Sequence, residues 1–225
     1  MMIKNNKQDF VNFIFNKGII KFGKFRLKSG RQSPYFFDFG SFNDSSKIIS
    51  LGNFYANSII ENKLEFDVIF GPAYKGIPIC LSTVIALSNN YDINVNFAFN
   101  RKEKKGHGEG GNIIGAPIKG KRVLAVDDVL TSGKTIKETK EIVEDQGGIL
   151  TSFLVALDRK EKAVNSQLSA LEQAAKTYNV NIYAVASISD VMEYIKETYG
   201  DSYPYFSLIK SYLQEYGCED IKNIK

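Results

Sequence analysis

Two adjacent acids and a loop rich in hydroxyl groups follow an apolar run in residues 122–135, RVLAVDDVLTSGKT. The acids are Asp127 and Asp128, and the loop continues to Gly133 and Thr135, where a helix is predicted. Backbone N–H groups and hydroxyls at a helix N-terminus bind phosphate. Carboxylates just upstream can accept hydrogen bonds from vicinal ribose hydroxyls or hold a hydrated magnesium ion. The segment predicts a site for a phosphorylated sugar, with a plain helix cap as the alternative.

The ending SGKT is similar to that of a P-loop, GxxxxGK followed by Ser or Thr. If Gly133 is the second glycine of that pattern, the first must stand at position 128, where this chain has Asp128. The mismatch argues against an ordinary nucleotide triphosphatase.

Cations and aromatic rings alternate in residues 25–40, FRLKSGRQSPYFFDFG. The residues concerned are Arg26, Lys28, Arg31, Tyr35, Phe36 and Phe37. Rings offer stacking surfaces and the cations attract an anion, so a planar, anionic aromatic ligand would suit the segment. The alternative is an aromatic β-hairpin with solvated lysines.

Three further segments place cations where anions collect. In residues 68–79, VIFGPAYKGIPI, Tyr74 and Lys75 lie in a turn between a predicted strand and a helix, although it could be a plain turn. Residues 101–115, RKEKKGHGEGGNIIG, combine five glycines with clustered cations and suit a lid, although most charge runs are simply solvated. Arg159 follows a predicted strand and could grip a carboxylate through two hydrogen bonds.

Strand-like and helix-like patterns alternate along most of the chain. Short apolar runs predict strands at residues 66–70, 95–99, 123–126, 149–157 and 180–185. Helical spacing predicts helices near Phe10, after Asp44 and over residues 77–87, 134–145, 163–178 and 205–216. Strands that are apolar on both faces and separated by helices predict an α/β fold with a parallel sheet covered on two sides. Ligands then bind beyond the carboxyl ends of the strands.

Length and composition limit the class of protein. The chain has 225 residues, 44% of them hydrophobic, which predicts a single globular domain. We expect neither a membrane span, because no apolar run approaches about 20 residues, nor a secretory signal, so a cytoplasmic location is expected. A net charge of +4 does not argue for nucleic acid. Cys80 and Cys218 are expected to be buried.

The acid pair and its loop resemble the phosphoribosyl pyrophosphate motif of the type I phosphoribosyltransferases. LKSGRQSPYFF is similar to the N-terminal signature of the orotate phosphoribosyltransferases within that family, and RKEKKGHGEGG resembles their catalytic loop, with departures at Lys104 and Gly106. The resemblance implies a Rossmann-like, mostly parallel sheet flanked by helices in one domain of residues 1–225. A small N-terminal hood would cover residues 1–42, and a flexible lid residues 100–115.

The resemblance also implies roles for individual residues. Catalytic roles fall to Lys105, His107, Asp127 and Asp128. The phosphoribosyl pyrophosphate site would comprise Lys28, Tyr74, Lys75, Arg101, Lys102, Lys105, His107, Asp127, Asp128, Val129, Leu130, Thr131, Ser132, Gly133, Lys134 and Thr135. Orotate would contact Phe36, Phe37, Thr131 and Arg159.

The resemblance implies joining of orotate to the ribose, with release of pyrophosphate and formation of orotidine 5'-monophosphate. Magnesium is the expected cofactor, held mostly by substrate oxygens and water rather than by protein ligands. A homodimer is expected, in which Arg101, Lys105 and His107 act at the neighbouring subunit's site; no nucleic acid or membrane partner is expected. Two alternatives stay open: an enzyme for another base, and a regulator that senses the same cosubstrate and binds nucleic acid.

Overall fold

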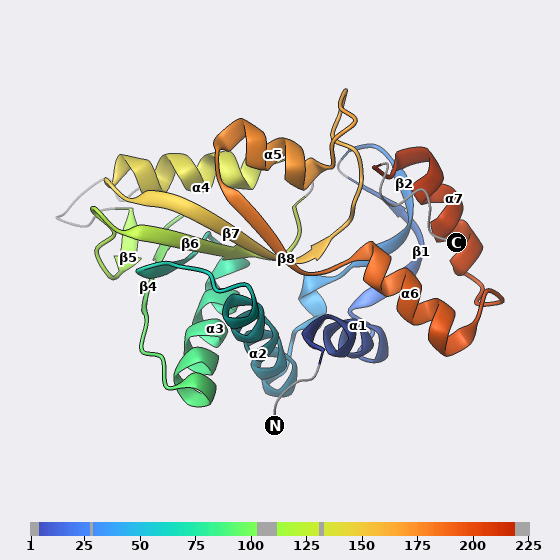
Figure 1. The fold of residues 1–225 in the computed structure, drawn as a ribbon, viewed down its shortest axis with the longest axis horizontal. Helices are drawn as coiled ribbons and strands as arrows, with labels where there is room; N and C mark the ends of the chain where they lie inside the picture. The colour runs from blue at the N-terminus through green and yellow to red at the C-terminus, as the bar shows by residue number, and fades with distance from the viewer. Residues whose placement is uncertain (1–4, 28, 103–111, 131–132, 219–225) are drawn as a thin grey trace.

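A six-stranded sheet forms the centre of the computed structural model, which describes residues 5–27, 29–102, 112–130 and 133–218 (Figure 1). Its strand order is β5-β4-β3-β6-β7-β8, and only β5 runs antiparallel to its neighbour. The strands are β3 (Val68–Gly71), β4 (Asn96–Asn100), β5 (Ile113–Gly115), β6 (Arg122–Asp127), β7 (Ile149–Asp158) and β8 (Asn181–Ser187). A separate antiparallel hairpin pairs β1 (Ile20–Arg26) with β2 (Gln32–Phe37).

Helices cover both faces of the sheet (Figure 1). On one face lie α1 (Asn6–Asn16), α2 (Ser45–Glu61) and α3 (Gly76–Tyr91), and on the other α4 (Lys134–Asp145) and α5 (Ala170–Tyr178). The chain ends beside the hairpin with α6 (Ile188–Tyr199) and α7 (Phe206–Tyr216). Successive residues of β3 alternate between two cores: Ile69 packs in one, and Val68 and Phe70 in the other. This two-sided burial is why the strand reads as a continuous apolar run.

The α/β prediction is confirmed, and the predicted strand runs overlap β3, β4, β6, β7 and β8. Asp44 caps α2 by accepting a hydrogen bond from the Lys47 backbone N–H at 2.9 Å. Both cysteine side chains are buried, as expected. Among the described helices, none has the length and apolar character that crossing a bilayer requires.

The prediction of a helix over residues 163–178 was wrong for the first half of that range. The helix α5 begins only at Ala170, where Ser169 and Glu172 form a reciprocal capping box. Asn165 has a left-handed backbone with φ of 56°, and the Val164 side chain is 77% exposed instead of lying on an apolar helix face. A capping box satisfies the first free N–H groups of a helix, so it fixes the start more strongly than apolar spacing does.

The hairpin lies within the predicted hood of residues 1–42, and β5 closes the predicted lid of residues 100–115. Residues 103–111 of that lid lie outside the described residues. The division of the chain into hood, body and lid stays a prediction.

Close packing of α2 on α3 supports the strands that carry the site. A Cβ atom added at Gly52 would stand 2.3 Å from the backbone oxygen of Ser82 on α3. Such a contact is far shorter than van der Waals distance, so the two helices would have to separate.

We therefore expect Gly52→Ala to lower the free energy of unfolding by about 1–3 kcal/mol, the usual range for overpacking. Urea denaturation measures this loss. Ser50→Ala, on the same helix and bonded only to the Ser46 backbone oxygen, is the control and should change stability by less than about 0.5 kcal/mol. Equal effects of the two substitutions would contradict the packing argument.

Candidate active site

The acid pair lies at the carboxyl end of β6, in the middle of the sheet. Asp127 is the last residue of the strand and only 8% exposed. The Tyr55 hydroxyl, from α2, donates a hydrogen bond to the Asp127 backbone oxygen at 2.7 Å. The backbone oxygen of Asp128 accepts from the Ala156 N–H of β7 at 2.8 Å. The backbone of both acids is therefore fixed by neighbouring elements.

The two carboxyl groups have different surroundings. Burial and the neighbouring Asp128 raise the pKa of Asp127 to about 7. Asp128 is 14% exposed in its side chain and accepts a hydrogen bond from Lys75 Nζ at 2.6 Å. Near neutral pH the site therefore holds one ion-paired carboxylate and one carboxyl group close to its titration point.

The loop from β3 to α3 brings Tyr74 and Lys75 to the same edge of the sheet. Lys75 reaches Asp128, and its Nζ lies 5.8 Å from the centre of the Phe39 ring. The Ala73–Tyr74 peptide bond is cis. The Lys102 ammonium lies 4.9 Å from the centre of the Tyr74 ring. The structure thus brings Tyr74, Lys75, Lys102 and the acid pair into one region, as the sequence predicted.

Asn100 makes a hydrogen bond in this region that was not predicted from the sequence. It ends β4, is 9% exposed, and its Oδ1 accepts a hydrogen bond from the Ala73 N–H at 2.9 Å. It ties the turn that carries Tyr74 to the start of the predicted lid. In the sequence, Asn100 stands out as the polar residue that ends the alternating run NFAFN. Its hydrogen-bond partner, Ala73, lies 27 residues away.

The loop from β6 to α4 has only part of the predicted phosphate cradle within the described residues. Gly133 caps α4 with a left-handed φ of 69°, a conformation that glycine adopts without a steric penalty. Leu130 is 3% exposed and packs in the core, and the Lys134 side chain runs along α4 to Glu138 at 3.6 Å. Thr131 and Ser132 lie outside the described residues, as do Lys28, Lys105 and His107.

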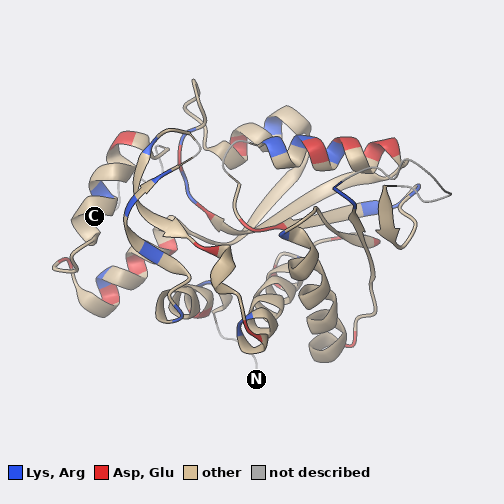
Figure 2. Cartoon of the chain, turned by 180° about the vertical axis from the view of Figure 1, so that it is seen from behind, with Lys and Arg blue, Asp and Glu red and all other residues tan. Residues whose placement is uncertain are grey.

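Charges on α4 itself are balanced. Three Lys–Glu pairs at i,i+4 spacing run along it, and Figure 2 shows the two signs interspersed on this helix. The surface of α4 is therefore not a one-sign patch.

Phe36 and Phe37 face opposite sides of the hairpin. Phe36 is 39% exposed and stacks on Phe25 with ring centres 5.4 Å apart. Phe37 is 5% exposed and packs against Phe42 in the core. Successive strand residues must alternate in this way, so only Phe36 offers an open face to a ligand.

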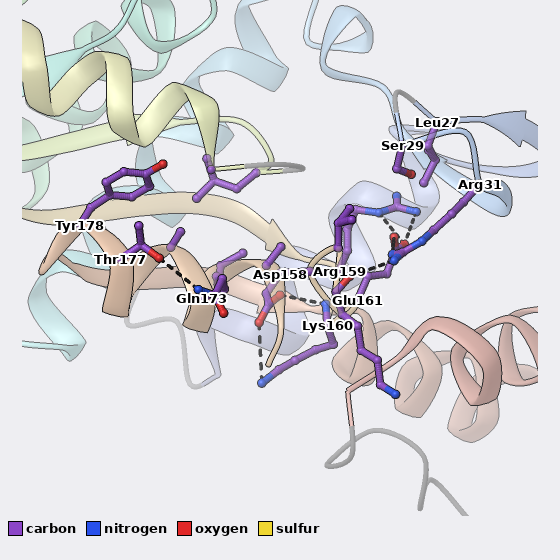
Figure 3. Close-up of a pocket in the computed structure, with 18 residues that line it drawn as sticks. Leu27, Ser29, Arg31, Asp158, Arg159, Lys160, Glu161, Gln173, Thr177 and Tyr178 are labelled. Atoms are coloured by element: carbon purple, nitrogen blue, oxygen red, sulfur yellow. Dashed lines mark hydrogen bonds and ion pairs between the residues drawn. The ribbon is translucent and has the colours of Figure 1, made fainter. Parts of the chain in front are cut away.

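A cavity of about 380 Å³ lies between the loop that joins β1 to β2, the β7–α5 connection and α5. Figure 3 shows Arg31, Arg159 and Glu161 grouped on one side of it, and Gln173, Thr177 and Tyr178 of α5 on the other. Its lining joins apolar residues such as Leu27 and Leu130 to charged ones. A partly apolar site with a few charged groups suits a small planar anion.

Arg159 lines this cavity while being 5% exposed. Its guanidinium donates to Glu161 and Ser33 and lies 4.2 Å from the centre of the Tyr35 ring. Arg31, which the sequence offered as a cation for an anionic ligand, is instead engaged with Glu161 and the Lys162 backbone oxygen. Glu161 and Ser33 were not predicted as part of this group, and Tyr35 was predicted as a ring for a ligand rather than as a partner of Arg159.

The cavity and the acid pair lie beyond the ends of two adjacent strands of the sheet. The strands β6 and β7 are parallel, and the bond from Ala156 to Asp128 sets their register at the carboxyl edge. Arg159 follows Ala156 by three residues. In the described part of the chain, no group of three or more potential ligands is placed to hold a metal.

The phosphoribosyl transferase domain family matches residues 39–201, and the chain belongs to it. Similarity to named proteins narrows this class. The chain is 44% identical over 215 residues to an orotate phosphoribosyltransferase of Alteromonas mediterranea, covering 96% of this chain and 100% of that protein. An orotate phosphoribosyltransferase of Escherichia coli is 41% identical over the same shares. The protein is therefore a pentosyltransferase enzyme of the orotate phosphoribosyltransferase family.

Solved structures agree with this assignment. The crystal structure of an orotate phosphoribosyltransferase from Francisella tularensis has a TM-score of 0.83 and 35% identity, covering 93% of this chain and 99% of that one. An adenine phosphoribosyltransferase from Thermoanaerobacter pseudethanolicus, at 19% identity and a TM-score of 0.52, covers 79% of this chain and 99% of its own, and shares the fold alone.

The raised pKa of Asp127 predicts a pH-dependent stability. Its ordinary value is 3.8, so the folded protein holds this proton more tightly than the unfolded chain does, and stability falls as pH rises from about 4 to about 7. Asp127→Asn removes the buried carboxylate. We expect its Tm, relative to that of the unsubstituted protein, to be about 5 °C higher at pH 8 than at pH 5.

Thermal denaturation at both pH values measures this shift. A Tm difference that does not change with pH would mean that Asp127 is already ionised in the folded protein at pH 5.

Proposed function

We propose that the protein transfers the ribose 5-phosphate group of 5-phosphoribosyl 1-pyrophosphate to orotate. The products are orotidine 5'-monophosphate and pyrophosphate, a step of de novo pyrimidine (UMP) biosynthesis. One observation carries the proposal: the acid pair at the end of β6 and the arginine-lined cavity at the end of β7 lie on adjacent parallel strands. A ribose at the acids would have its anomeric carbon near a base in the cavity.

The sugar-phosphate site is proposed at the β6–α4 loop. Asp127 and Asp128 would accept hydrogen bonds from the ribose hydroxyls, because ionised carboxylates are strong acceptors. The loop from Val129 through Leu130, Thr131 and Ser132 to Gly133, Lys134 and Thr135 would bind the 5'-phosphate. The start of α4 at Gly133 supports this, because the first N–H groups of a helix have no partner within it and no side chain of a described residue caps this end, so they can bind an anion.

The pyrophosphate side is proposed at the β3–α3 loop and the lid. Tyr74 and Lys75 would contact pyrophosphate, together with Arg101, Lys102, Lys105, His107 and Lys28. Lys75 already pairs with Asp128, and its side chain is 57% exposed. Exchange of that partner for a phosphate oxygen would leave Asp128 free to bind the ribose.

The base is proposed in the cavity beside Arg159, with Phe36, Phe37 and Thr131 as further contacts. The exposed face of Phe36 suits stacking, whereas Phe37 would act from within the core. Hydrogen bonds from Arg159 Nη1 would recognise the orotate carboxylate, because Nε and Nη2 are engaged with Glu161 and Ser33.

Chemistry at the anomeric carbon needs placement and charge stabilisation rather than an enzyme nucleophile. The bond from C1 to the pyrophosphate oxygen breaks, and a bond from C1 to a ring nitrogen of orotate forms. Positive charge develops on the ribose ring, the carboxylate of Asp128 would stabilise that charge, and the proton carried by the attacking nitrogen is released. Lys105 and the other lid cations would stabilise the negative charge on the departing pyrophosphate.

Magnesium is proposed as the cofactor. The residues fit it: paired carboxylates are hard oxygen ligands, and the described residues lack a cluster that would hold the ion alone. Asp127 and Asp128 would meet the ion through ribose oxygens and water. When bound, the ion neutralises charge on the pyrophosphate.

The active form is proposed to be a homodimer in the cytoplasm. Arg101, Lys105 and His107 of one subunit would act at the neighbouring subunit's site.

The reaction is tested by mixing the protein with orotate, phosphoribosyl pyrophosphate and magnesium. Loss of orotate's ultraviolet absorbance should match release of pyrophosphate, and both should require magnesium. Adenine in place of orotate is the control and should give no pyrophosphate. Turnover with adenine but not with orotate would overturn the proposal.

Lys105→Ala is expected to lower kcat by about 10² to 10³, the scale for one preorganised charge contact, with little change in orotate binding. Steady-state kinetics measure both quantities. An unchanged kcat would remove Lys105 from the mechanism.

Mixing Lys105→Ala subunits with Asp128→Asn subunits tests the shared site. A heterodimer should recover activity at the one site that receives an intact lid and intact acids. Inactive heterodimers of verified composition would show that each site is built from one chain.

A further inference from the structure

We propose that Glu161 is a positioning residue for the base. It fixes the guanidinium of Arg159 in the plane and direction needed to meet the carboxylate of orotate. The proposal rests on the proposed function and adds to it a specificity determinant, because Glu161 sets the preference for a base that carries a carboxylate.

The contacts of Arg159 define its orientation. Glu161 Oε1 accepts from Arg159 Nε at 2.9 Å and lies 2.7 Å from Nη2. Nη2 also donates to the Ser33 hydroxyl at 2.9 Å. These bonds hold one edge of the guanidinium, and the Tyr35 ring lies 4.2 Å from its carbon. A planar fork held along one edge and against a ring cannot rotate freely, so its direction relative to the cavity is set before the ligand arrives.

Glu161 is itself held firmly. It is 8% exposed, its backbone pairs with Gly217 after α7, and its carbonyl accepts from the Ala170 N–H at the start of α5 at 2.9 Å. Oε1 also accepts from the Tyr35 hydroxyl at 3.4 Å. Its carboxylate therefore links the hairpin to the end of β7, and its backbone holds it to Gly217 and α5, so it cannot follow Arg159 if the arginine moves.

The charge of the group favours an anionic ligand. Oε2 of Glu161 pairs with Arg31 Nη1 at 3.3 Å, so Glu161 serves two arginines at once. Two guanidinium groups share this one carboxylate, and the rest of the lining adds Lys160 and Lys162 against Asp158, so cations outnumber acids around the cavity. Buried charge is costly unless it is paired, and the carboxylate of orotate would complete the pairing. A neutral base would leave the charge uncompensated.

The test shortens the side chain without changing its charge. Glu161→Asp withdraws the carboxylate by one methylene, so the net charge of the group is kept while Arg159 loses its fixed edge. We expect KM for orotate to rise about tenfold, with KM for phosphoribosyl pyrophosphate and kcat at saturation within about twofold of the unsubstituted enzyme. Glu172→Asp, the same change at an exposed capping residue of α5, is the matched control and should leave KM for orotate unchanged.

Ser33→Ala is the second variant, because it removes one bond to Arg159 and leaves every charge of the group in place. We expect KM for orotate to rise about threefold to tenfold and KM for phosphoribosyl pyrophosphate to stay constant. If Glu161→Asp does not fold, this variant decides the question.

Two results would overturn the proposal. One is an unchanged KM for orotate in the variants that fold. The other is a loss that falls equally on both substrates and on kcat, which marks a purely structural role. The unsubstituted enzyme is the separate test of function, because its failure to consume orotate rejects the reaction whatever the variants do.

Discussion

Burial of charged groups at the carboxyl edge of one sheet is the constraint on which this structure depends. Asp127, Arg159 and Glu161 are each less than a tenth exposed, and all three lie at or just beyond the ends of adjacent strands. An ion removed from water costs several kcal/mol unless other groups compensate it. Most of the surrounding architecture supplies that compensation.

The compensating groups come from segments far apart in the chain. Lys75 reaches Asp128 from the β3–α3 loop, and the hairpin brings Ser33 and Arg31 to Arg159 and Glu161. The last of these contacts spans 130 residues. Packing of the hairpin on the body therefore completes the buried charge cluster, so the cavity beside Arg159 depends on the hairpin.

The acid pair and the cavity beside Arg159 differ in how their charges are held. At the acid pair, one carboxylate is neutralised by an exposed lysine, and the other has a pKa raised by burial, so the pair can take up or release charge when a sugar phosphate and cations arrive. At the cavity, the arginine is held rigidly by a carboxylate and a hydroxyl. Adaptable charge suits the polyanionic substrate, and fixed charge suits recognition of a small planar one.

Local patterns in the sequence determined the α/β alternation, the acid pair after β6, the turn carrying Tyr74 and Lys75, and the family. Each of these depends on residues that are consecutive in the chain. Only the tertiary structure decided that Arg31 pairs with Glu161 and that Asn100 holds the Ala73 N–H. The start of α5 at Ala170 depends on the local capping pair Ser169 and Glu172, which the apolar spacing of residues 163–178 concealed. The period of a strand could have separated Phe36 from Phe37 in advance. The partners of Arg31 and Arg159 could not be found this way, because contacts across more than a hundred residues depend on how the hairpin packs on the sheet and leave no spacing in the sequence.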